Sequence, residues 1–403
     1  MARPAKSLSV GKDNTQHLSL GVLALCFPAH KIQAIIGDCG KASERIRDLP
    51  AAVVAFYVIA LSLFPGAGYQ SVLRWLITGL QWLGVGRFRV SGKGALSAAR
   101  QRLGAEPMRR IHEQMAPPLA DPSIAGCYWK GMHLVALDGS TLALQDTVSN
   151  ATAFGRSSNQ NGDGAYPLAR FVALVEVGTH LIFAAELGRY CDAEIRLAEP
   201  LLAHLKPGML CLADRLFPGY HLWKQAAASG SHLLWRAKAA MELAKIEDLP
   251  DGSWLARWYP SRNRKTEPAG QVVRVIEYKL KGKRPKAENG SDDETYRLIT
   301  TILDPQTASA KELAEIYPQR WEIEITIKEG KSILRRGQVT LRSKVAELVK
   351  QEFWGMLLAH YLVRKMMAQA ALKNGIDPDE LSYQGSVEII KSTQAGPVLS
   401  FPP

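Results

Sequence analysis

The sequence predicts a mixed α/β protein with an all-α N-terminal domain, and two observations carry this prediction. Between residues 18 and 120, long apolar runs are broken by Pro and Gly, a pattern typical of packed helices. From about residue 130, shorter apolar runs alternate with turns and a helical segment, which is typical of a domain built on a sheet. A chain of 403 residues is long enough for two or three domains.

The overall charge points to a polyanionic partner. Fifty Lys and Arg residues against 38 Asp and Glu give a net charge of +12, which favours nucleic acid first and an acidic membrane surface second. The five cysteines form no C-x-x-C pair, and the nine histidines show no H-x-H or H-E-x-x-H spacing. These patterns argue against a disulfide framework and a zinc site, and they favour a reducing cytoplasm.

Two apolar stretches resemble membrane or export segments but lack their defining features. Residues 51–64 lie between two prolines and are fewer than the ~20 that a membrane-spanning helix needs. Residues 18–27 end in FPAH and not in a small-x-small cleavage site. We therefore expect both stretches to be buried helices, and we expect no membrane partner.

Residues 1–17 are predicted to be a disordered tail and residues 18–125 a helical N-terminal DNA-binding domain. Within this domain, two basic helical segments flank Leu103-Gly104 and resemble a helix-turn-helix. Two solvated amphipathic helices explain the same stretch equally well, so both interpretations stay open at this point. The basic residues concerned are Arg87, Arg89, Lys93, Arg100, Arg102, Arg109 and Arg110.

The order of elements from 126 to 231 indicates the first part of a ribonuclease-H-like catalytic core. A strand is predicted at HLVALDGSTLAL and a polar loop over 149–166. Two further strands, RFVALVEV and HLIFAAEL, are joined by Gly178-Thr179, a short turn typical of a hairpin. A helix over AEIRLAEPLLAHL and a strand at GMLCLADR follow. Strand, hairpin, helix and strand in this order open a ribonuclease-H-like α/β domain.

A β-rich insertion is predicted to interrupt this core over 232–295. Short strand candidates are separated there by the basic loops SRNRKT and KGKRPKAENGSDDE. The last candidate, TYRLITTIL, is expected to return to the main sheet. Residues 296–375 complete the core with C-terminal helices, and residues 376–403 are predicted to be a tail.

Asp138 and Asp214 occupy the same kind of position. Each follows an apolar strand candidate, so its carboxylate is held at the rim of the sheet. Either aspartate alone is explained as a turn residue or a helix N-cap, but the shared context favours a functional pair. On neighbouring strands the two anions would lie ~5 Å apart and would need cations between them, for which Mg²⁺ and Mn²⁺ are suited. A two-metal site would require a third carboxylate.

A predicted helix over YPQRWEIEITIKEGK supplies that carboxylate. Pro318 is tolerated in a first helical turn, so we place the start of the helix there, with Tyr317 at its entrance. At ~100° per residue, Glu324 shares one narrow face with Arg320 and Lys331. Among the glutamates of this stretch, Glu324 is therefore the one grouped with the Tyr, Arg and Lys residues.

The other features of this helix have ordinary explanations. Glu322 and Glu329 lie ~160–180° away from that face, where they are solvated or structural. An i,i+4 salt bridge between Glu324 and Lys328 is the plain alternative to a functional grouping. Gly330 is unusual inside a helix, where glycine costs ~1 kcal/mol, and it loosens the expected positioning of Lys331.

The spacing in this helix resembles the Tyr-Arg-Glu-Lys signature of bacterial cut-and-paste insertion-sequence transposases of the insertion-element-four family. The four matching residues are Tyr317, Arg320, Glu324 and Lys331. Asp138 in LDGST and Asp214 in LADR are similar to the first two members of that family's Asp-Asp-Glu triad. Further similarity runs through NATAFGR and YPLARFVALVEVGTH, and the resemblance covers roughly residues 18–375.

The resemblance implies a role for each of these residues. Asp138, Asp214 and Glu324 would be catalytic and would bind two Mg²⁺ ions, for which Mn²⁺ can substitute. Tyr317, Arg320 and Lys331 would contact the DNA backbone near the transposon end, where Arg and Lys neutralise phosphate. An aromatic residue of the insertion would stack on a base displaced from the duplex. The candidates are Trp235, Trp254 and Trp258.

The implied function is that of a DDE transposase, which moves an insertion sequence by cut-and-paste transposition. It would cleave double-stranded DNA at terminal inverted repeats, pass through a hairpin and join the freed ends to target DNA. A homodimer in a synaptic complex, acting in the bacterial cytoplasm at the nucleoid, is expected. Three alternatives stay open: an inactive, transposase-derived sequence-specific DNA-binding protein, a general nuclease, and a basic structural or membrane-surface protein.

Overall fold

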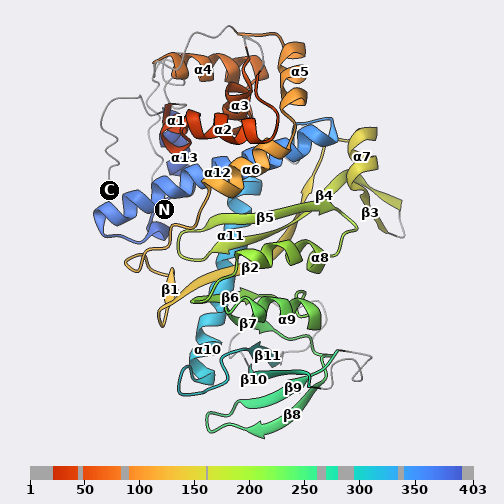
Figure 1. Ribbon diagram of the computed structural model, residues 1–403, viewed down its shortest axis with the longest axis vertical. Coiled ribbons are helices and arrows are strands. Elements are labelled where there is room, and N and C mark those ends of the chain that lie inside the picture. The colour runs from red at the N-terminus through yellow and green to blue at the C-terminus, as the bar shows by residue number, and fades with distance from the viewer. Residues whose placement is uncertain are drawn as a thin grey trace, which may run out of the picture.

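One mixed sheet runs through most of the molecule, with helices on both of its faces and a group of helices at one end (Figure 1). The computed structural model describes residues 21–43, 49–82, 90–159, 162–260, 269–279, 295–334 and 340–392, and within them the sheet has eleven strands. The predicted α/β class with a helical N-terminal region is confirmed. The tail predicted at 1–17 lies outside the described residues.

Six helices are described in the N-terminal region: α1 (Gly21–Cys26), α2 (Ala29–Asp38), α3 (Ala51–Leu63), α4 (Tyr69–Trp82), α5 (Lys93–Leu103) and α6 (Glu106–Met115). Helix α3 is apolar on all sides, and its residues from Ala52 to Leu63 are all buried, as expected for a core helix. It packs on the long helix α12 (Ala346–Asn374), where a Cβ at Gly355 would lie 2.9 Å from the carbonyl oxygen of Val58. The prediction of a buried helix over 51–64 is thus confirmed.

The two basic segments do form helices α5 and α6 on either side of Leu103-Gly104, but they do not present one free basic face. Arg100 is only 5% exposed, and its guanidinium donates to Gln351 and Ser343 near and within α12. Arg109 and Arg110 both pair with Glu106. For Arg100, the interpretation as a DNA-facing residue is wrong, because its guanidinium is buried against α12. Its partners lie about 250 residues further along the chain. Arg87 and Arg89 lie outside the described residues.

The strands are β1 (Tyr128–Trp129), β2 (Met132–Ala143), β3 (Arg156–Asn159), β4 (Gly162–Glu176), β5 (Leu181–Arg189), β6 (Met209–Ala213), β7 (His232–Arg236), β8 (Leu243–Asp248), β9 (Trp254–Trp258), β10 (Gln271–Lys279) and β11 (Thr295–Thr300). Their order is β3-β4-β2-β6-β7-β11-β10-β9-β8, with β1 paired to β2 and β5 paired to β4. Strands β4 and β5 form the predicted hairpin, and β2, β6 and β7 are parallel to one another.

Side chains of β2 alternate between two cores on opposite faces of the sheet. Leu134 and Ala136 pack in the core that contains residues of α11 (Trp321–Lys328) and α12. Val135 and Leu137 pack in the other core, which contains residues of α8 (Glu194–Ala198) and α9 (Tyr220–Ala228). Successive residues of β2 therefore face either the core with α11 and α12 or the core with α8 and α9.

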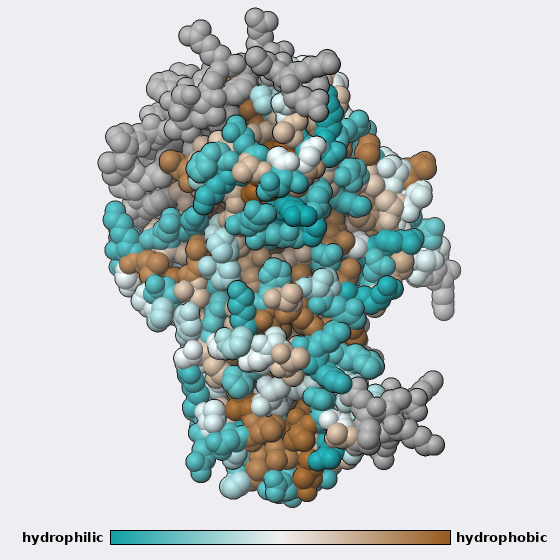
Figure 2. Space-filling view, in the orientation of Figure 1, coloured by the Kyte–Doolittle hydropathy of each residue, from teal (hydrophilic) through white to brown (hydrophobic). Residues whose placement is uncertain are grey.

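Beyond β7 the sheet continues without interruption. Strand β7, at the predicted start of the insertion, pairs directly with β6. Strand β11 pairs with β7 on one side and β10 on the other, so the last candidate strand returns to the main sheet as predicted. Figure 2 shows an apolar area at this end of the molecule, and Ile246 of β8 and Val272 of β10 are exposed there.

Two segments that were predicted to lack regular structure contain it. The predicted loop 149–166 includes most of α7 (Val148–Phe154), which is capped by the Thr147 hydroxyl, and also β3 and the start of β4. The predicted tail from 376 includes a short 3-10 helix (Pro378–Glu380) and α13 (Tyr383–Ser392), which contacts α12. Across the described part of the chain, no helix is both long enough and apolar enough to cross a membrane.

Candidate active site

The two aspartates lie at equivalent positions on neighbouring parallel strands. Asp138 is one residue beyond Leu137 in β2, and Asp214 is one residue beyond Ala213, the last residue of β6. Leu137 and Ala213 are partners in the parallel register, so Asp138 and Asp214 stand level with each other. Only Asp214 follows the end of its strand, because β2 continues past Asp138 to Ala143. Since apolar residues two positions earlier on both strands pack in the α11 core, both aspartates continue the alternation towards the α11 face.

Arg320 joins the first carboxylate to the third. Its Nη1 lies 3.3 Å from Oδ2 of Asp138, and its Nη2 lies 3.0 Å from Oε1 of Glu324. The Arg320 side chain is only 6% exposed, whereas the Glu324 side chain is 44% exposed. The structure thus links Glu324, carried by α11, to Asp138 of β2 through Arg320, and the helical spacing predicted the grouping of Glu324 with Arg320.

The Asp138 carboxyl carries the electrostatic signature of a crowded anionic site. Burial is the largest influence and raises the pKa of Asp138 to about 6, against the opposing effects of the Gly139 N–H and of Arg320. The charges of Asp214 and Glu324 add to the rise, so each of these two carboxylates lies close enough to Asp138 to repel it. A site of this kind favours the binding of cations.

The helical segment that carries Glu324 begins earlier than predicted. Helix α10 (Ala310–Ile316) starts at Ser309, which forms a capping box with Glu312. A 3-10 turn over Tyr317–Arg320 then leads into α11. The predicted start at Pro318 is wrong, because the helical segment already begins with α10. Pro318 lies in the first turn of the 3-10 segment, where a missing N–H is tolerated.

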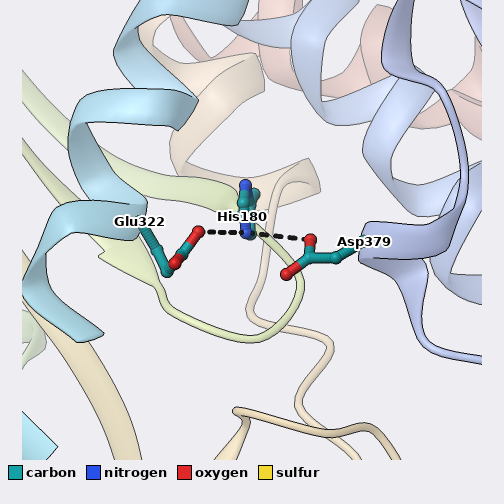
Figure 3. A group of neighbouring side chains, drawn as sticks. All are labelled: His180, Glu322 and Asp379. Carbon is teal, nitrogen blue, oxygen red and sulfur yellow. Dashed lines mark ion pairs between the residues drawn. The ribbon is translucent and has the colours of Figure 1, made fainter. Parts of the chain in front are cut away.

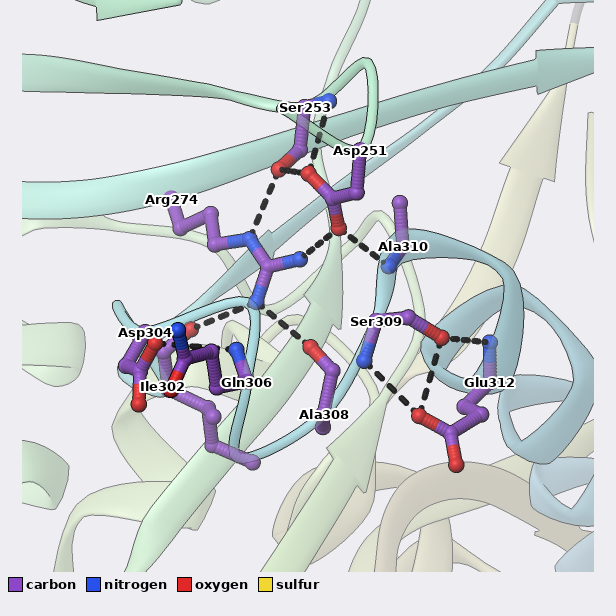
Figure 4. A network of polar contacts seen from close by, with 10 residues as sticks. All are labelled: Asp251, Ser253, Arg274, Ile302, Asp304, Gln306, Ala308, Ser309, Ala310 and Glu312. Carbon is purple, nitrogen blue, oxygen red and sulfur yellow. Dashed lines mark hydrogen bonds and ion pairs between the residues drawn. The ribbon is translucent and has the colours of Figure 1, made fainter. Parts of the chain in front are cut away.

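The start of α10 is fixed by a network around Arg274 of β10 (Figure 4). This guanidinium is fully buried and donates to the Ala308 carbonyl at 2.7 Å and to Ser253 Oγ at 2.8 Å. It also pairs with Asp251, which accepts a hydrogen bond of 2.6 Å from the Ala310 N–H. The strands beyond β7 are therefore tied to the segment that leads to Glu324.

Tyr317 and Lys331 contact the two aspartate-bearing strands from the same segment. Tyr317 is 4% exposed, and its hydroxyl donates to the carbonyl of Ala213 at 3.3 Å, directly before Asp214. Lys331 Nζ donates to Ser140 Oγ at 2.9 Å, two residues beyond Asp138. All four residues of the signature therefore lie near the second half of β2 or the end of β6.

Lys331 stands in a π-helical turn, Glu329–Ile333, that follows α11. Such turns insert an extra residue into a helix and are frequent at functional sites. Gly330 lies in this turn with open space around it, so it is part of a local irregularity and does not weaken a regular helix. The sequence-based concern about Gly330 is answered by this geometry.

The three candidate tryptophans point to the other face of the sheet. Trp235 and Trp258 are 0% and 6% exposed and pack with Trp223 of α9. Trp254 is partly buried against the same core. Trp321, the first residue of α11, is instead 49% exposed, with the Arg320 guanidinium 4.9 Å from its ring centre.

The donor set suits hard divalent cations, because it consists of three carboxylates at a partly open rim. Their oxygens do not all lie within 4.8 Å of one another, and among the described residues the group that meets this limit is His180, Glu322 and Asp379. Arg320 stands between Asp138 and Glu324 and accounts for part of the separation.

Comparison with known proteins decides the family. Residues 17–113 match the family described as insertion element 4 transposase N-terminal, and residues 129–362 match the transposase DDE domain. This chain belongs to the insertion element 4 family of DDE transposases. The matched DDE domain contains all three carboxylates and all four residues of the Tyr-Arg-Glu-Lys signature.

Two relatives of this transposase come from Escherichia coli (strain K12). The transposase InsG for insertion sequence element IS4 is 29% identical over 366 residues, which are 89% of this chain and 79% of the relative. A putative transposase, InsZ, is 27% identical over 218 residues, which are 54% of this chain and 71% of the relative. Among solved structures, the piggyBac transposase synaptic complex with hairpin DNA matches with a TM-score of 0.44 at 10% identity, over 93% of this chain and 79% of that chain.

Sequence reasoning also missed a carboxylate near Asp214, which is carried by α8 on the other face of the sheet. Glu194, the first residue of α8, fills the space beside Gly139, where a Cβ would lie 2.8 Å from its Cδ. It pairs with Arg170 of β4 at 3.0 Å. Burial raises the pKa of Glu194 and Arg170 opposes this, while the charge of Asp214 adds to the rise. A glycine directly after a strand aspartate is a signal of close approach that was available in the sequence.

Proposed function

We propose that this transposase moves its own insertion sequence by cutting double-stranded DNA at the terminal inverted repeats and joining the freed ends to target DNA. The observation that carries the proposal is the convergence of Asp138, Asp214 and Glu324 on one rim, with Arg320 buried among them. Intact carboxylates in this arrangement favour an active enzyme over an inactive DNA-binding relative.

Two Mg²⁺ ions, or Mn²⁺ in their place, are proposed to be held by Asp138, Asp214 and Glu324. When bound, such ions lower the pKa of water and stabilise the charge on the attacking and leaving oxygens of an in-line displacement at phosphorus. The protein itself supplies a rigid frame for the carboxylates, since Asp138 lies within β2 and Asp214 directly follows β6. Arg320 neutralises part of their charge and faces the same space.

The proposed DNA contacts are Tyr317, Arg320 and Lys331. Arg320 and Lys331 would meet phosphate oxygens next to the cleaved bond, as Arg and Lys side chains commonly do. Tyr317 already donates to the Ala213 carbonyl and is buried, so its support for the site includes holding the backbone directly before Asp214. The DNA contact of Tyr317 stays a prediction.

The proposed domain division is a ribonuclease-H-like core in two parts, 126–231 and 296–375, interrupted by the insertion at 232–295. Residues 18–125 are proposed to bind DNA, and two transposon ends are proposed to be held in a homodimeric synaptic complex. Such a complex would act at the nucleoid in the bacterial cytoplasm. The net charge of +12 supports binding to an extended polyanion.

The decisive experiment is nicking of labelled end DNA by the purified protein. Wild type should nick in Mg²⁺ and not in EDTA, and Asp138→Ala, Asp214→Ala and Glu324→Ala should each abolish nicking. Nicking that survives any of these changes would overturn the site assignment. Equal cleavage of DNA without the end sequence would indicate a general nuclease, and end binding without cleavage would indicate the inactive DNA-binding alternative.

A further inference from the structure

The side of α11, and of the π-helical turn after it, that lies opposite Glu324 is anchored by a buried ionic cluster. Glu329 is 4% exposed, and its carboxylate accepts from Arg364 Nε at 2.9 Å, from Arg364 Nη2 and from His360 Nε2, the last at 3.2 Å. Arg364 and His360 both lie on α12 and are 3% and 0% exposed. The solvated interpretation of Glu329 is excluded, and the structural one holds.

Arg364 also reaches a second point on the same helix through a histidine. Its Nη2 lies 2.7 Å from Nδ1 of His180, which is at the turn between β4 and β5. The His180 Nε2 points between two carboxylate oxygens, at 3.3 Å from Glu322 and 3.2 Å from Asp379 (Figure 3). One guanidinium thus connects α12, the hairpin turn and the back of α11, while Asp379 brings in the segment after α12.

The chemistry of this contact favours a hydrogen-bonded anchor over a metal site. An arginine can only donate, so His180 Nδ1 must accept from Arg364, and the imidazole proton then sits on Nε2. A metal held by Glu322, Asp379 and His180 would need the lone pair of Nε2. That would place a proton on Nδ1, directly facing the donor of Arg364.

The cluster is a costly way to gain stability. Burial opposes ionisation of Glu329, but the His360 hydrogen bond and the charge of Arg364 lower its pKa, so that a full buried ion pair results. Replacing such pairs by apolar residues is often neutral or stabilising. Among the described residues, His180 Nε2 contacts Glu322 and Asp379 as ion pairs but makes no hydrogen bond, and His360 Nδ1 and Arg364 Nη1 also lack a hydrogen-bond partner. What the cluster provides is a defined orientation, because each hydrogen bond fixes the relative position of the two side chains that it joins.

We propose that Arg364 is a positioning residue for the transposase reaction, which fixes the rotation of α11 about its axis and thereby the places of Glu324 and Lys331. Glu322 stands two residues before Glu324, and Glu329 stands two residues before Lys331. The two anchors, Glu322 and Glu329, are seven residues or ~10 Å apart along the helix. Together they therefore fix both the rotation of the helix and its position along its own axis. This inference rests on the carboxylate site of the proposed function.

The test compares Arg364→Lys with Arg100→Lys. Lysine keeps the charge but cannot bond to Glu329 with two nitrogens and to His180 at once. Arg100 is a matched control, because it is also a buried guanidinium bound to α12 and contacts none of the three carboxylates. For Arg364→Lys we expect nicking to slow and the Mg²⁺ concentration for half-maximal nicking to rise by ~10–100-fold, as for other changes behind metal ligands. Binding of end DNA and the Arg100→Lys rates should stay near wild type.

Wild-type nicking and Mg²⁺ dependence in Arg364→Lys would overturn the proposal, and so would an equal loss in Arg100→Lys at matched melting temperature. Glu322→Gln weakens one anchor at a half-buried position and should shift the Mg²⁺ dependence in the same direction, so it decides the question if Arg364→Lys does not fold. Mn²⁺ affinity of the DNA-free protein, measured by electron paramagnetic resonance, should also fall in Arg364→Lys. If wild type binds Mn²⁺ but never nicks, the proposed function fails. The Mn²⁺ affinities of wild type and Arg364→Lys then still test the positioning role.

The same measurement separates the anchor from a metal site. The triple variant Asp138→Ala, Asp214→Ala, Glu324→Ala should bind no Mn²⁺ or Zn²⁺ at the cluster. Binding that persists in the triple variant and disappears when His180→Ala is added would place a metal at His180, and it would overturn the positioning proposal.

Discussion

Replacing Asp138 by Asn is expected to stabilise the metal-free transposase while abolishing its activity. Burial raises the pKa of the Asp138 carboxyl to about 6 in the folded protein, from an ordinary value near 3.8. Each unit of such a difference corresponds to ~1.4 kcal/mol, so ionised Asp138 costs the fold about 3 kcal/mol at neutral pH. Asparagine removes this cost and keeps an oxygen that can accept from the Gly139 N–H.

The sign of the pH dependence follows from the raised pKa. A carboxyl that binds its proton more tightly in the folded state favours folding at low pH, and this contribution is lost as pH rises from about 4 to about 6. The advantage of Asp138→Asn should therefore be near zero below pH 4 and complete above pH 6. The rate of nicking by wild type should decrease below pH 6, because the Asp138 carboxylate must lose its proton to bind a cation.

The assay is thermal unfolding in EDTA at pH 7.5, compared with pH 4. With an unfolding entropy of about 2.1 cal/mol/K per residue, a gain of about 3 kcal/mol corresponds to roughly 3–4 °C in Tm for a chain of this length. Asp248→Asn is the control, because that side chain is 75% exposed and its replacement should change stability by less than about 0.5 kcal/mol. A lower Tm for Asp138→Asn at pH 7.5, or a gain that does not shrink at pH 4, would refute the reasoning.

Three further changes test other contacts. Arg274→Met removes a fully buried guanidinium, leaves the partly buried Asp251 without its ion-pair partner and should cost about 3 kcal/mol in thermal unfolding. Arg297→Met, at a more exposed pair, should cost about 1 kcal/mol or less, and similar losses in the two variants would contradict this reasoning. Gly139→Ala should lower the free energy of unfolding by about 1–3 kcal/mol, because its Cβ would lie 2.8 Å from Glu194 Cδ. Glu194→Ala should remove most of this penalty in a double-mutant cycle, and additive losses in the two variants would count against the contact. Arg320→Met should strengthen Mn²⁺ binding, since it frees two carboxylates from their present cation, yet slow nicking; weaker Mn²⁺ binding would argue against competition between the two cations.

The parts of the structure that the sequence predicted well are those set by local patterns. The β4–β5 hairpin follows from two apolar runs and a two-residue turn signal. The shared position of Asp138 and Asp214 follows from the apolar runs before them, because the parallel register brings the residues after these runs side by side. The grouping of Arg320 with Glu324 follows from the four-residue spacing, which survives the change from a 3-10 turn to α11.

The parts that the sequence missed depend on partners far along the chain. Glu329 looked solvated or structural from helical periodicity, and only Arg364, 35 residues later, decides for burial. Arg100 looked like a surface residue of a basic helix until Gln351 accounted for its guanidinium. No local pattern reports such a partner, because a buried charge and a solvated charge have the same sequence signature.

The front and back of α11 are therefore two halves of one arrangement. On the front, Arg320 contacts both Asp138 and Glu324, so the position of Glu324 relative to the strands depends on how far the helix is rotated. On the back, Glu329 is held by hydrogen bonds from Arg364, and Glu322 by an ion pair with His180, and together they limit rotation. A half-exposed glutamate on a short helix with irregular turns before and after it would otherwise be a poorly placed ligand. The buried cluster offsets that irregularity, which explains why so costly a set of charges lies behind the rim where the reaction is proposed to occur.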